Sequence, residues 1–549
     1  MRAPRPLMAT LAVALVVLVA MPLGFVLLQA VFPGLASGSL AKPFSHLSAT
    51  LGDPALLKLI GNTLKLGLAV VLLSALIGIP LGALRGLYRV PFAACWDVLL
   101  LVPFMVPPYI AALGWIMFLQ PRGYLQQIVG VNLGEFLFSV YGVAFVMTLN
   151  VFPVVYFAVS RSLAASGSRL ADAARVAGAS PWQCFTRVTL PLAMPGIAAS
   201  LLLVFTMAIE EYGTPAALAA NAGFYVLVTG IERRFSDWPI DLPGASTLSM
   251  ILVTMAMTAY FIQRRLLAGR GYETQTGKPA QGQARSLGPW RVPVVIAFAA
   301  IGVIAAGVPL FAILATAFSR TLSGGLAWDN LSLIHFEAIA QSGGSAGRAL
   351  GTSLSLGAAA ALITGALGFG VAYCVVKSRS RGRVVLDVLS VLPNTLPGVV
   401  VAVGMILAWN QSFWPVSPYD SWAILLMAYC CLMLPYPVRY ANAAFTQLAD
   451  SLEAAARVHG AGGFMVMTRI LLPLILPSML AAMLMVFAVA SRELVASLLL
   501  APSGVQTVSL FIWRQFEQGS VGQGMAMSAV TIFMTTGITL LVTLRLNRL

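Results

Sequence analysis

Charged side chains are scarce in this chain. Only 9% of its 549 residues are Asp, Glu, Lys or Arg, whereas 59% are hydrophobic, and the mean hydropathy is +0.90. Because soluble globular domains are roughly a quarter charged, this deficit excludes an ordinary water-soluble fold. A chain that crosses a bilayer must pair its backbone polar groups internally, as helices or as a closed barrel. The sequence shows long apolar runs rather than the alternating polarity of barrel strands, which favours helices.

Residues that bind metals or carry redox chemistry are also few and dispersed. The three histidines lie on different expected segments and show no metal-ligand spacing. The five cysteines form no Cys-x-x-Cys pair, and most fall in or beside apolar runs, where packing is the expected role. The sequence therefore predicts no metal site and no cofactor bound by this chain. The histidines are His46, His335 and His459, and the cysteines are Cys95, Cys184, Cys374, Cys430 and Cys431.

An ATP-binding loop is missing as well. Such a loop needs Gly-Lys-[Ser/Thr], so that backbone amides and the lysine can hold phosphates. Of the five lysines only Lys278 follows a glycine, and Pro279 comes next. No convergent nucleophile, base or metal group indicates a membrane enzyme either. We therefore expect no enzymatic activity in this chain, and any ATP that it depends on must be hydrolysed by another chain.

The chain does have hydrophobic runs of spanning length. Leu7 to Gly34 and Val292 to Ser319 hold no charged residue, and each exceeds the roughly 20 residues that cross a bilayer. A cleaved secretion signal is the alternative for the first run, but its apolar stretch exceeds the roughly 7–15 residues of a signal. We expect an all-α integral membrane protein of about twelve transmembrane helices. They lie near residues 7–32, 61–83, 96–118, 138–160, 192–211, 243–263, 292–317, 351–376, 386–409, 421–441, 474–491 and 525–544.

The basic residues indicate which way the chain crosses the membrane. With the N-terminus in the cytoplasm, alternating spans put 23 of the 33 Lys and Arg residues in cytoplasmic connections and tails. This bias follows the positive-inside rule, so both termini are expected in the cytoplasm. The same bias explains the net charge of +15, so the excess of basic residues does not indicate a nucleic-acid partner. The expected surroundings are membrane lipid.

A polar segment divides the chain into two similar halves. Residues 264–291 are rich in Gly, Gln and Arg and read as a cytoplasmic linker. It joins two expected lobes, 1–263 and 292–549, with six spans each. Because an even number of spans returns the chain to the same side, both lobes insert in the same direction. This is a parallel repeat, with a pseudo-two-fold axis along the membrane normal and a substrate path between the lobes.

Matched motifs at nearly constant offsets support the repeat. The four prolines of the third and ninth spans are expected to bend those helices. Two matched aspartates are expected near helix N-termini, where the helix dipole favours a carboxylate. At an offset of 290, residues 61–64 match 351–354, Asp97 matches Asp387, Pro103 matches Pro393, Pro107 matches Pro397 and Gly114 matches Gly404; at an offset of 282, residues 173–176 match 455–458, Leu190-Pro191 matches Leu472-Pro473 and Glu211 matches Glu493.

The most informative segment follows the fourth span of each lobe, near residues 166–191 and 448–473. Each copy holds an Ala-Ala-Arg-Val stretch, a glycine two residues later, and a Leu-Pro pair after a spacer. The alanines favour a helix with a low surface on which another protein can pack, and each glycine permits a left-handed exit from that helix. The arginines can pair with acidic groups of a partner. The expected coupling residues are Asp172, Ala173, Ala174, Arg175 and Gly178 in the first copy, and Glu453, Ala455, Ala456, Arg457 and Gly460 in the second.

Both segments resemble the EAA loop of ABC-importer permeases, E-A-A-x3-G-x9-I-x-L-P, and the resemblance covers nearly the whole chain. It implies a type I importer permease in the bacterial inner membrane, with each loop forming a short coupling helix that docks on a cytoplasmic ATPase dimer. It also implies a periplasmic substrate-binding protein as a partner. The chain departs from the pattern at Asp172, where the family prefers Glu, and at Ala454, with Glu453 one residue earlier. The acidic contact of the second loop is therefore expected to be shifted or weakened.

Two permease domains fused in one chain resemble the ferric-iron permeases. The segment from Glu210 to Leu218 looks like the corresponding stretch of that group. The resemblance implies ferric iron as cargo, with 2-aminoethylphosphonate, thiamine or a polyamine as alternatives for the same machinery. An ion-coupled secondary transporter is the alternative from another class. It would need no ATPase-docking loops and often carries buried acids in mid-span, of which the expected spans hold almost none.

Charged residues end the fifth and eleventh expected spans. Charge at the edge of the bilayer is costly and marks a functional hypothesis. We predict that these residues line an outer gate or a docking surface, and the alternative is that they lie in water beyond the helix ends. They are Glu210, Glu211, Arg492 and Glu493.

Overall fold

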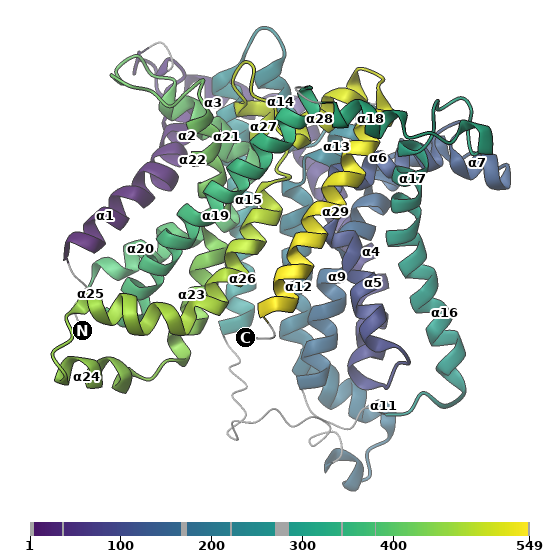
Figure 1. The fold of residues 1–549 in the computed structure, drawn as a ribbon, viewed down its shortest axis with the longest axis horizontal. Coiled ribbons are helices and arrows are strands. Elements are labelled where there is room, and N and C mark those ends of the chain that lie inside the picture. The colour runs from purple at the N-terminus through teal and green to yellow at the C-terminus, as the bar shows by residue number, and fades with distance from the viewer. Residues whose placement is uncertain are drawn as a thin grey trace. The chain divides into compact units, whose positions relative to one another are not determined.

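The computed structural model describes residues 5–35, 38–165, 173–219, 222–268, 285–341, 344–378 and 380–546. Within these ranges the regular structure is helical, and the β-type pairings are two isolated bridges (Figure 1). The chain is an all-α membrane protein, as its sequence predicts. Residues 269–284 of the expected linker lie outside the described ranges.

Long apolar helices dominate the described chain. Eight are long and apolar enough to cross a membrane, or up to eleven if each of three bent helix pairs is one span. The twelfth expected span lies in α29 (Val521–Leu546), whose side chains are described only to residue 537. The eight are Pro6–Val31, Pro54–Leu87, Val140–Ala164, Trp182–Glu210, Leu242–Leu266, Gly288–Ala317, Ser345–Lys377 and Gly463–Ala490, and the bent pairs are Ala93–Met105 with Pro108–Val129, Gly382–Thr395 with Gly398–Trp409, and Trp422–Met433 with Pro435–Gln447.

The helices form two compact units, whose boundaries differ from those of the two sequence halves. The first unit holds residues 1–52, 231–253 and 332–549. Besides α29, its helices are α1 (Arg5–Leu15), η1 (Val16–Ala20), α2 (Met21–Val31), α3 (Ser45–Leu51), α18 (Ile334–Ala340), α19 (Ser345–Lys377), α20 (Gly382–Val391), η8 (Leu392–Thr395), α21 (Gly398–Trp409), α22 (Trp422–Met433), α23 (Pro435–Gln447), α24 (Asp450–Val458), α25 (Gly463–Val466), η9 (Met467–Leu471), α26 (Leu472–Ala490), α27 (Val495–Leu500) and α28 (Val508–Glu517).

The second unit holds residues 53–230 and 254–331. Two helices, α14 (Leu227–Ser236) and α15 (Leu242–Ala268), contribute residues to both units. The helices that lie wholly in the second unit are α4 (Pro54–Leu87), α5 (Ala93–Met105), α6 (Pro108–Leu119), α7 (Tyr124–Val129), α8 (Gly134–Leu137), α9 (Val140–Ala165), α11 (Pro181–Cys184), η3 (Phe185–Thr189), α12 (Leu190–Glu210), α13 (Gly213–Leu218), η5 (Gly288–Trp290), α16 (Arg291–Gly302), η6 (Val303–Gly307), α17 (Val308–Ala317) and η7 (Trp328–Asn330).

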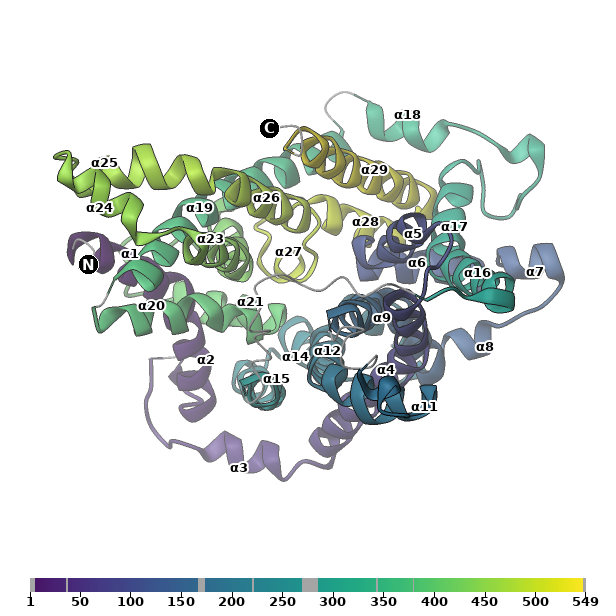
Figure 2. The same cartoon turned by 90° about the horizontal axis from the view of Figure 1, so that it is seen from below.

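Each unit combines most of one sequence half with the first span of the other half. In the first unit, α2 from the N-terminal half packs against α21 from the C-terminal half. In the second unit, α17 from the C-terminal half packs against α6 from the N-terminal half (Figure 2). The expected lobes, 1–263 and 292–549, therefore describe the sequence repeat, whereas the compact units exchange one span.

Glycines bring the long helices of the second unit close together. A Cβ atom at Gly78 would lie 2.8 Å from the Cβ of Val155, and one at Gly82 would lie 2.7 Å from the carbonyl oxygen of Tyr156. Both glycines lie on α4 and both partners on α9. Small residues four apart are what allow membrane helices to pack backbone to backbone. Gly368, the repeat counterpart of Gly78, is similarly close to a proline of α23.

The expected proline bends are present in both halves. α5 meets the segment Pro108–Val129, which begins with α6, at an angle of 95°, with Pro107 in the break. The segment Gly382–Thr395 meets α21 at 117°, with Pro397 in the break. A proline removes a helical hydrogen bond and clashes with the preceding turn. The prediction that the third and ninth spans are bent is therefore confirmed.

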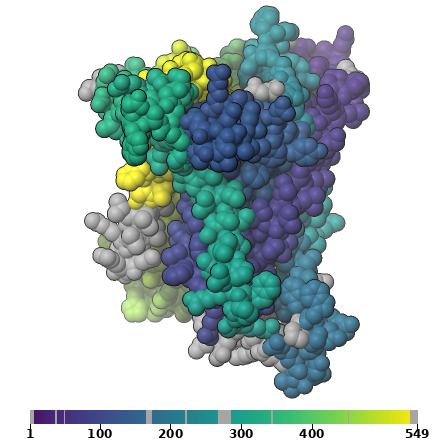
Figure 3. All heavy atoms as spheres, turned by 90° about the vertical axis from the view of Figure 1, so that its right-hand side faces the viewer, coloured from purple at the N-terminus to yellow at the C-terminus, as the bar shows by residue number. Residues whose placement is uncertain are grey.

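An apolar stripe on the second unit provides a surface for lipid. The exposed side chains of α16, η6 and α17 include Val292, Ile296, Val303 and Phe311, which are 42–64% exposed. Figure 3 shows this stretch in teal along the surface, with α7 and α8 in blue near one end of it. An extended exposed apolar surface on a helix of spanning length is suited to acyl chains rather than water.

Candidate functional site

The first coupling segment ends in a turn that favours glycine. Gly178 follows a short helix and has a φ of +88°. The Gly178 N–H donates to the Arg175 carbonyl oxygen at 2.9 Å, and the Ala179 N–H donates to the Ala174 carbonyl oxygen at 3.0 Å. These two bonds form the Schellman motif, which closes a helix at a left-handed residue. The expected coupling residue Asp172 lies outside the described ranges.

The second coupling segment, α24, ends in the same way. Gly460 has a φ of +82°. The Gly460 N–H donates to the Arg457 carbonyl oxygen at 2.9 Å, and the Ala461 N–H donates to the Ala456 carbonyl oxygen at 3.0 Å. All four positions lie 282 residues after their counterparts in the first segment. Both predicted left-handed exits are therefore present.

Both segments expose large apolar side chains at matched positions. Val176 and Val458 are 91% and 85% exposed, and they are 282 residues apart. Trp182 and Phe464, also 282 residues apart, are 71% and 77% exposed. The surrounding helix positions are small, with Ala173 and Ala455 both exposed, as are the two arginines of the motif. The sequence motif alone did not predict that a valine and an aromatic residue would be exposed here. The recurrence of both residues at the 282-residue offset was the signal in the sequence that could have indicated them.

The acidic residue of the second segment lies in the interior. Glu453 is 1% exposed, and its Oε1 is 3.5 Å from the Nζ of Lys377. That ammonium group also donates a 3.1 Å hydrogen bond to the carbonyl oxygen of Leu448. The structure thus brings Glu453 to the end of α19 and away from the exposed alanines and valine of α24.

The predicted gate glutamates lie where spans give way to short helices. In the second unit, Glu210 is the last residue of α12, and its Oε1 is buried and accepts no hydrogen bond from a described residue. The neighbouring Glu211 uses its Oε1 to accept a 3.2 Å hydrogen bond from the Thr214 N–H, in the first turn of α13. Its carboxylate therefore caps a helix rather than lying free in water.

The matching glutamate of the first unit has the same arrangement. Glu493 Oε1 accepts hydrogen bonds from the N–H groups of Val495, at 3.1 Å, and Ala496, at 3.3 Å, in the first turn of α27. Burial raises the pKa of Glu493 above its ordinary value near 4.5, although these two N–H groups act in the opposite direction. Arg492 precedes it in the chain. In each unit the two residues are adjacent in sequence. Glu211 caps the start of α13, and Glu493 caps the start of α27.

An ion pair stabilises the C-terminal end of α4. The single N–H at Nε of Arg85 is shared between both carboxylate oxygens of Asp97, each at 3.1 Å, and Nη2 donates a second hydrogen bond to Oδ2 at 2.7 Å. Tyr156 adds a hydrogen bond at 2.6 Å from its hydroxyl to Asp97 Oδ1. The expectation of a helix N-terminal role is wrong for both aspartates, because α5 and α20 begin earlier and have no acidic residue in their first turns. Asp387, the repeat counterpart, is exposed.

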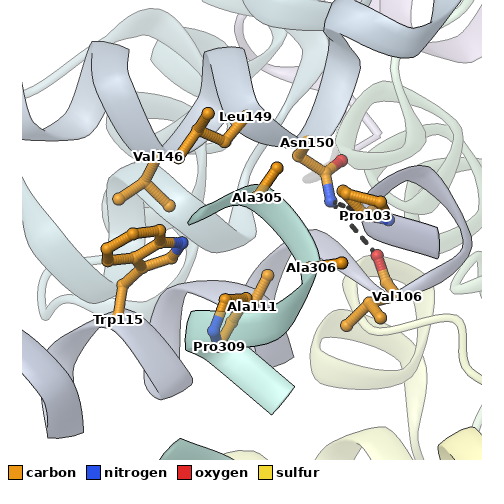
Figure 4. A pocket seen from close by; sticks show the side chains of 10 residues that line it. All are labelled: Pro103, Val106, Ala111, Trp115, Val146, Leu149, Asn150, Ala305, Ala306 and Pro309. Carbon is orange, nitrogen blue, oxygen red and sulfur yellow. Dashed lines mark hydrogen bonds between the residues drawn. The ribbon is translucent and has the colours of Figure 1, made fainter. Parts of the chain in front are cut away.

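The break between α5 and α6 is closed by a side chain from α9. Asn150 Nδ2 donates to the carbonyl oxygens of Pro103, at 2.7 Å, and Val106, at 3.2 Å (Figure 4). These carbonyls have lost helical partners at the bend, so the amide satisfies them inside the membrane region. The adjoining cavity measures about 10 Å³, which is room for one water at most. It is a packing defect beside a bent helix and too small for cargo.

The described residues contain no group of three or more His, Cys, Asp or Glu side chains that could hold a metal ion. In the described part of the chain, the buried thiols of Cys184, Cys374, Cys430 and Cys431 form no disulfide, and Cys95 is exposed. Within the described ranges the side-chain chemistry is therefore that of helix packing and charge pairing.

A family model described as binding-protein-dependent transport system inner membrane component matches residues 74–272 and 364–548, once in each half. The chain belongs to this family. The two matches together cover more than half of its residues, and each contains one coupling segment. It is therefore a multi-pass permease of the inner membrane.

Known members of this family resemble the chain over different lengths. The ferric transport system permease protein FbpB of Actinobacillus pleuropneumoniae is 25% identical over 502 residues, which cover 89% of this permease and 71% of the relative. The putative ferric transport system permease protein FbpB 1 of Haemophilus influenzae is 26% identical over 420 residues, 75% of this permease and 65% of the relative. The putative 2-aminoethylphosphonate transport system permease protein PhnV of Salmonella typhimurium is 26% identical over 241 residues, 44% of this permease and 88% of the relative.

Proposed function

We propose that this permease is the transmembrane subunit of an ABC importer that passes ferric iron from a periplasmic binding protein across the bacterial inner membrane. Both termini and both coupling segments lie in the cytoplasm in this proposal. Residues 1–263 and 292–549 supply one permease domain each, and 264–291 link them. ATP is bound and hydrolysed by a separate ATPase dimer, and the permease itself carries no cofactor.

The repeated coupling segment is the observation that carries the proposal. Each copy ends in the same glycine turn and exposes the same valine–aromatic pair 282 residues apart. A large apolar side chain that is nearly fully exposed outside the lipid region indicates a protein contact. Two such surfaces in one chain fit a partner that is itself a dimer, because each copy can receive one subunit.

The helix caps formed by Glu211 and Glu493 suggest how these residues contribute to a gate. We propose that Glu211 and Glu493 act by holding α13 and α27 at the ends of the fifth and eleventh spans. Their neighbours, Glu210 and Arg492, place an acidic residue and a basic residue at matched positions of the two halves. A substrate path that closes at these short helices would depend on their position more than on free charge.

The choice of ferric iron rests on the ferric relatives, which match the fused chain over most of its length. The PhnV match, which covers 44% of this permease, supports 2-aminoethylphosphonate as the second candidate. Thiamine and polyamines stay open as cargo for the same machinery. Iron uptake needs no metal cluster in the permease, because a metal that is cargo only passes through it.

Docking is tested by placing a charge on the exposed valines. We expect the double variant Val176→Asp, Val458→Asp to lose its copurifying ATPase, because an unpaired buried charge at the centre of an interface costs at least about 2 kcal/mol. The control is Ser286→Asp, which adds one such charge at an exposed position within the linker segment. An ATPase that still copurifies with the double variant would refute the docking role.

Orientation and cargo need separate measurements. In a Cys95→Ser background, an impermeant maleimide should label Val176→Cys and Val458→Cys in inverted vesicles only. Labelling in intact spheroplasts contradicts the proposed orientation. Radiolabelled ferric iron, supplied on the purified binding protein, should enter proteoliposomes that hold the whole complex and ATP. Uptake by the lone permease under an ion gradient would instead support a secondary transporter, and exclusive uptake of aminoethylphosphonate would identify the second cargo.

A further inference from the structure

A buried ion pair joins the second coupling helix to a membrane span. Lys377 is the last residue of α19, and its Nζ lies 3.5 Å from Oε1 of Glu453 on α24. The two side chains are 6% and 1% exposed. We propose that this pair is a positioning device that makes α24 and α19 move as one body during transport. The inference rests on the proposed coupling role of α24.

The energetics of burial make the pair a strong constraint. Neither carboxylate oxygen of Glu453 accepts a hydrogen bond from a described residue. Lys377 therefore supplies the opposite charge that this buried carboxylate needs. Separating two buried charges leaves both without compensation in a poorly solvated region, which is strongly unfavourable. A displacement of α24 must either carry the end of α19 with it or break the pair.

The same ammonium group also holds the chain that leads into α24. Lys377 Nζ donates to the carbonyl oxygen of Leu448, in the connection between α23 and α24. One helical turn earlier on α19, Tyr373 packs on Phe445 of α23, with ring centroids 6.1 Å apart. The entry to the coupling helix and its first turns are thus fixed to one point at the inner end of α19.

The matched positions of the first half cannot form the same ion pair. The repeat counterparts of Lys377 and Glu453 are Leu87 and Ala171, and neither carries a charge. The nearby Arg85 pairs instead with Asp97, which lies on α5 rather than on a coupling segment. The two coupling segments are therefore attached unequally. Motion of the second is transmitted directly to a span, whereas the uncharged residues at the matched positions of the first, Leu87 and Ala171, cannot form this ion pair.

The pair also explains the displaced acid of the second motif. Glu453 precedes the position of Asp172 in the repeat by one residue, which turns its side chain by about 100° around a helix. That rotation takes the carboxylate from the alanine face, which is exposed, to the face that meets α19. The acid is retained for an internal contact and not for the ATPase.

The test uses the intact complex of permease, ATPase and binding protein in proteoliposomes. Lys377→Met and Glu453→Gln should each keep the ATPase bound and hydrolysing ATP, yet lower cargo uptake per ATP about tenfold, within the range of coupling between sites. The charge exchange Lys377→Glu, Glu453→Lys and the conservative Lys377→Arg should restore most of the loss. Asp387→Asn, a charge removed from an exposed position, should leave the ratio unchanged.

If a single variant assembles poorly with the ATPase, the distance between α24 and α20 can be measured in the permease instead. Spin labels at Ser451 of α24 and Val384 of α20, both exposed, should give a narrow distance distribution in the parent protein. The distribution should broaden in Glu453→Gln and narrow again in the charge exchange.

Two outcomes overturn the inference: single variants with the parent uptake per ATP and the parent distance distribution, or a charge exchange no better than the singles. An ATPase that fails to bind the parent permease refutes the proposed function itself, which keeps the two failures distinct.

Discussion

Gly114 of α6 lies directly against the backbone of Pro309 in α17. A Cβ atom at position 114 would be 2.9 Å from the Pro309 carbonyl oxygen. The same contact occurs in the other unit, where a Cβ at Gly404 of α21 would lie 2.7 Å from the carbonyl oxygen of Pro22. The exchanged first spans are therefore held by one repeated contact that needs glycine on one side and a proline-containing turn on the other.

We predict that Gly114→Val and Gly404→Val each destabilise the permease. A branched side chain at either position must push the two helices apart, and overpacking of this kind costs roughly 1–3 kcal/mol. The midpoint of thermal unfolding in detergent should fall for both variants. The matched control is Gly351→Ala, because a Cβ at this α19 position meets no atom within 4 Å, so its unfolding midpoint should be unchanged or slightly higher. Equal midpoints for the valine variants and the parent would contradict the repeated contact.

The coupling turns give a second prediction. Gly178→Ala and Gly460→Ala place a Cβ at φ values of +88° and +82°, which costs about 1–2 kcal/mol for an L-residue. We expect the double variant to bind the ATPase more weakly, because unwinding either turn moves the exposed valine before it. Gly462→Ala is the control, since this nearby glycine has a φ of −68° and open space around it. Pull-down of the ATPase over a range of concentrations measures the difference, and identical binding of both alanine variants would count against the turns.

The polar cluster at the C-terminal end of α4 gives a third prediction. Tyr156→Phe removes one hydrogen bond to the Asp97 carboxylate and should lower the free energy of unfolding by about 1.5–3 kcal/mol, the usual range for a bond to a charged group. Asp97→Asn should cost more, because it also weakens the pair with Arg85. Asp387→Asn removes an exposed carboxylate at the matched position and should stay within about 0.5 kcal/mol of the parent. A double-mutant cycle between positions 97 and 156 should show coupling, and strict additivity would refute the cluster.

Features with a local cause could be predicted from the sequence. The proline bends follow from a missing N–H at Pro107 and Pro397, and the left-handed exits follow from Gly178 and Gly460 at the ends of alanine-rich turns. Each depends on a few neighbouring residues, so its signal is complete within a short window. The repeat strengthened every one of these predictions, since the same local cause appeared twice.

Features that depend on distant partners could not be predicted in this way. The contact of Pro22 with Gly404 joins residues from opposite halves, and nothing near either residue specifies the other. The inward turn of Glu453 depends on Lys377, which lies on a different helix. Asn150 closes the break after Pro103 only because α9 packs beside it. In each case the sequence showed an unusual residue type, but the reason for it lay across a helix interface.

A fourth prediction distinguishes the charge of the capping glutamates, Glu211 and Glu493, from their role in holding the short helices in position. Gln at positions 211 and 493 keeps an oxygen that can accept the backbone N–H bonds, whereas Ala removes it. We therefore expect the double Gln variant to keep most of its uptake, and the double Ala variant to lose about 1 kcal/mol of stability per site, as for lost helix caps, together with most of its uptake. Uptake of radiolabelled cargo by the reconstituted complex measures this, and loss in the Gln variant as severe as in the Ala variant would show that charge itself is needed.

The pH dependence of the Glu493→Gln variant gives a direct check on the burial of that carboxyl group. Because burial raises the folded-state pKa of Glu493 above about 4.5, the protonated parent gains stability that is complete below the unfolded-state pKa and is lost as the pH rises through the raised value. Gln resembles the protonated form at every pH. The variant should therefore be more stable than the parent at neutral pH, and this advantage should shrink towards pH 4.5. Unfolding midpoints measured across that interval decide the matter, since a constant difference would mean that Glu493 keeps its ordinary pKa in the folded protein.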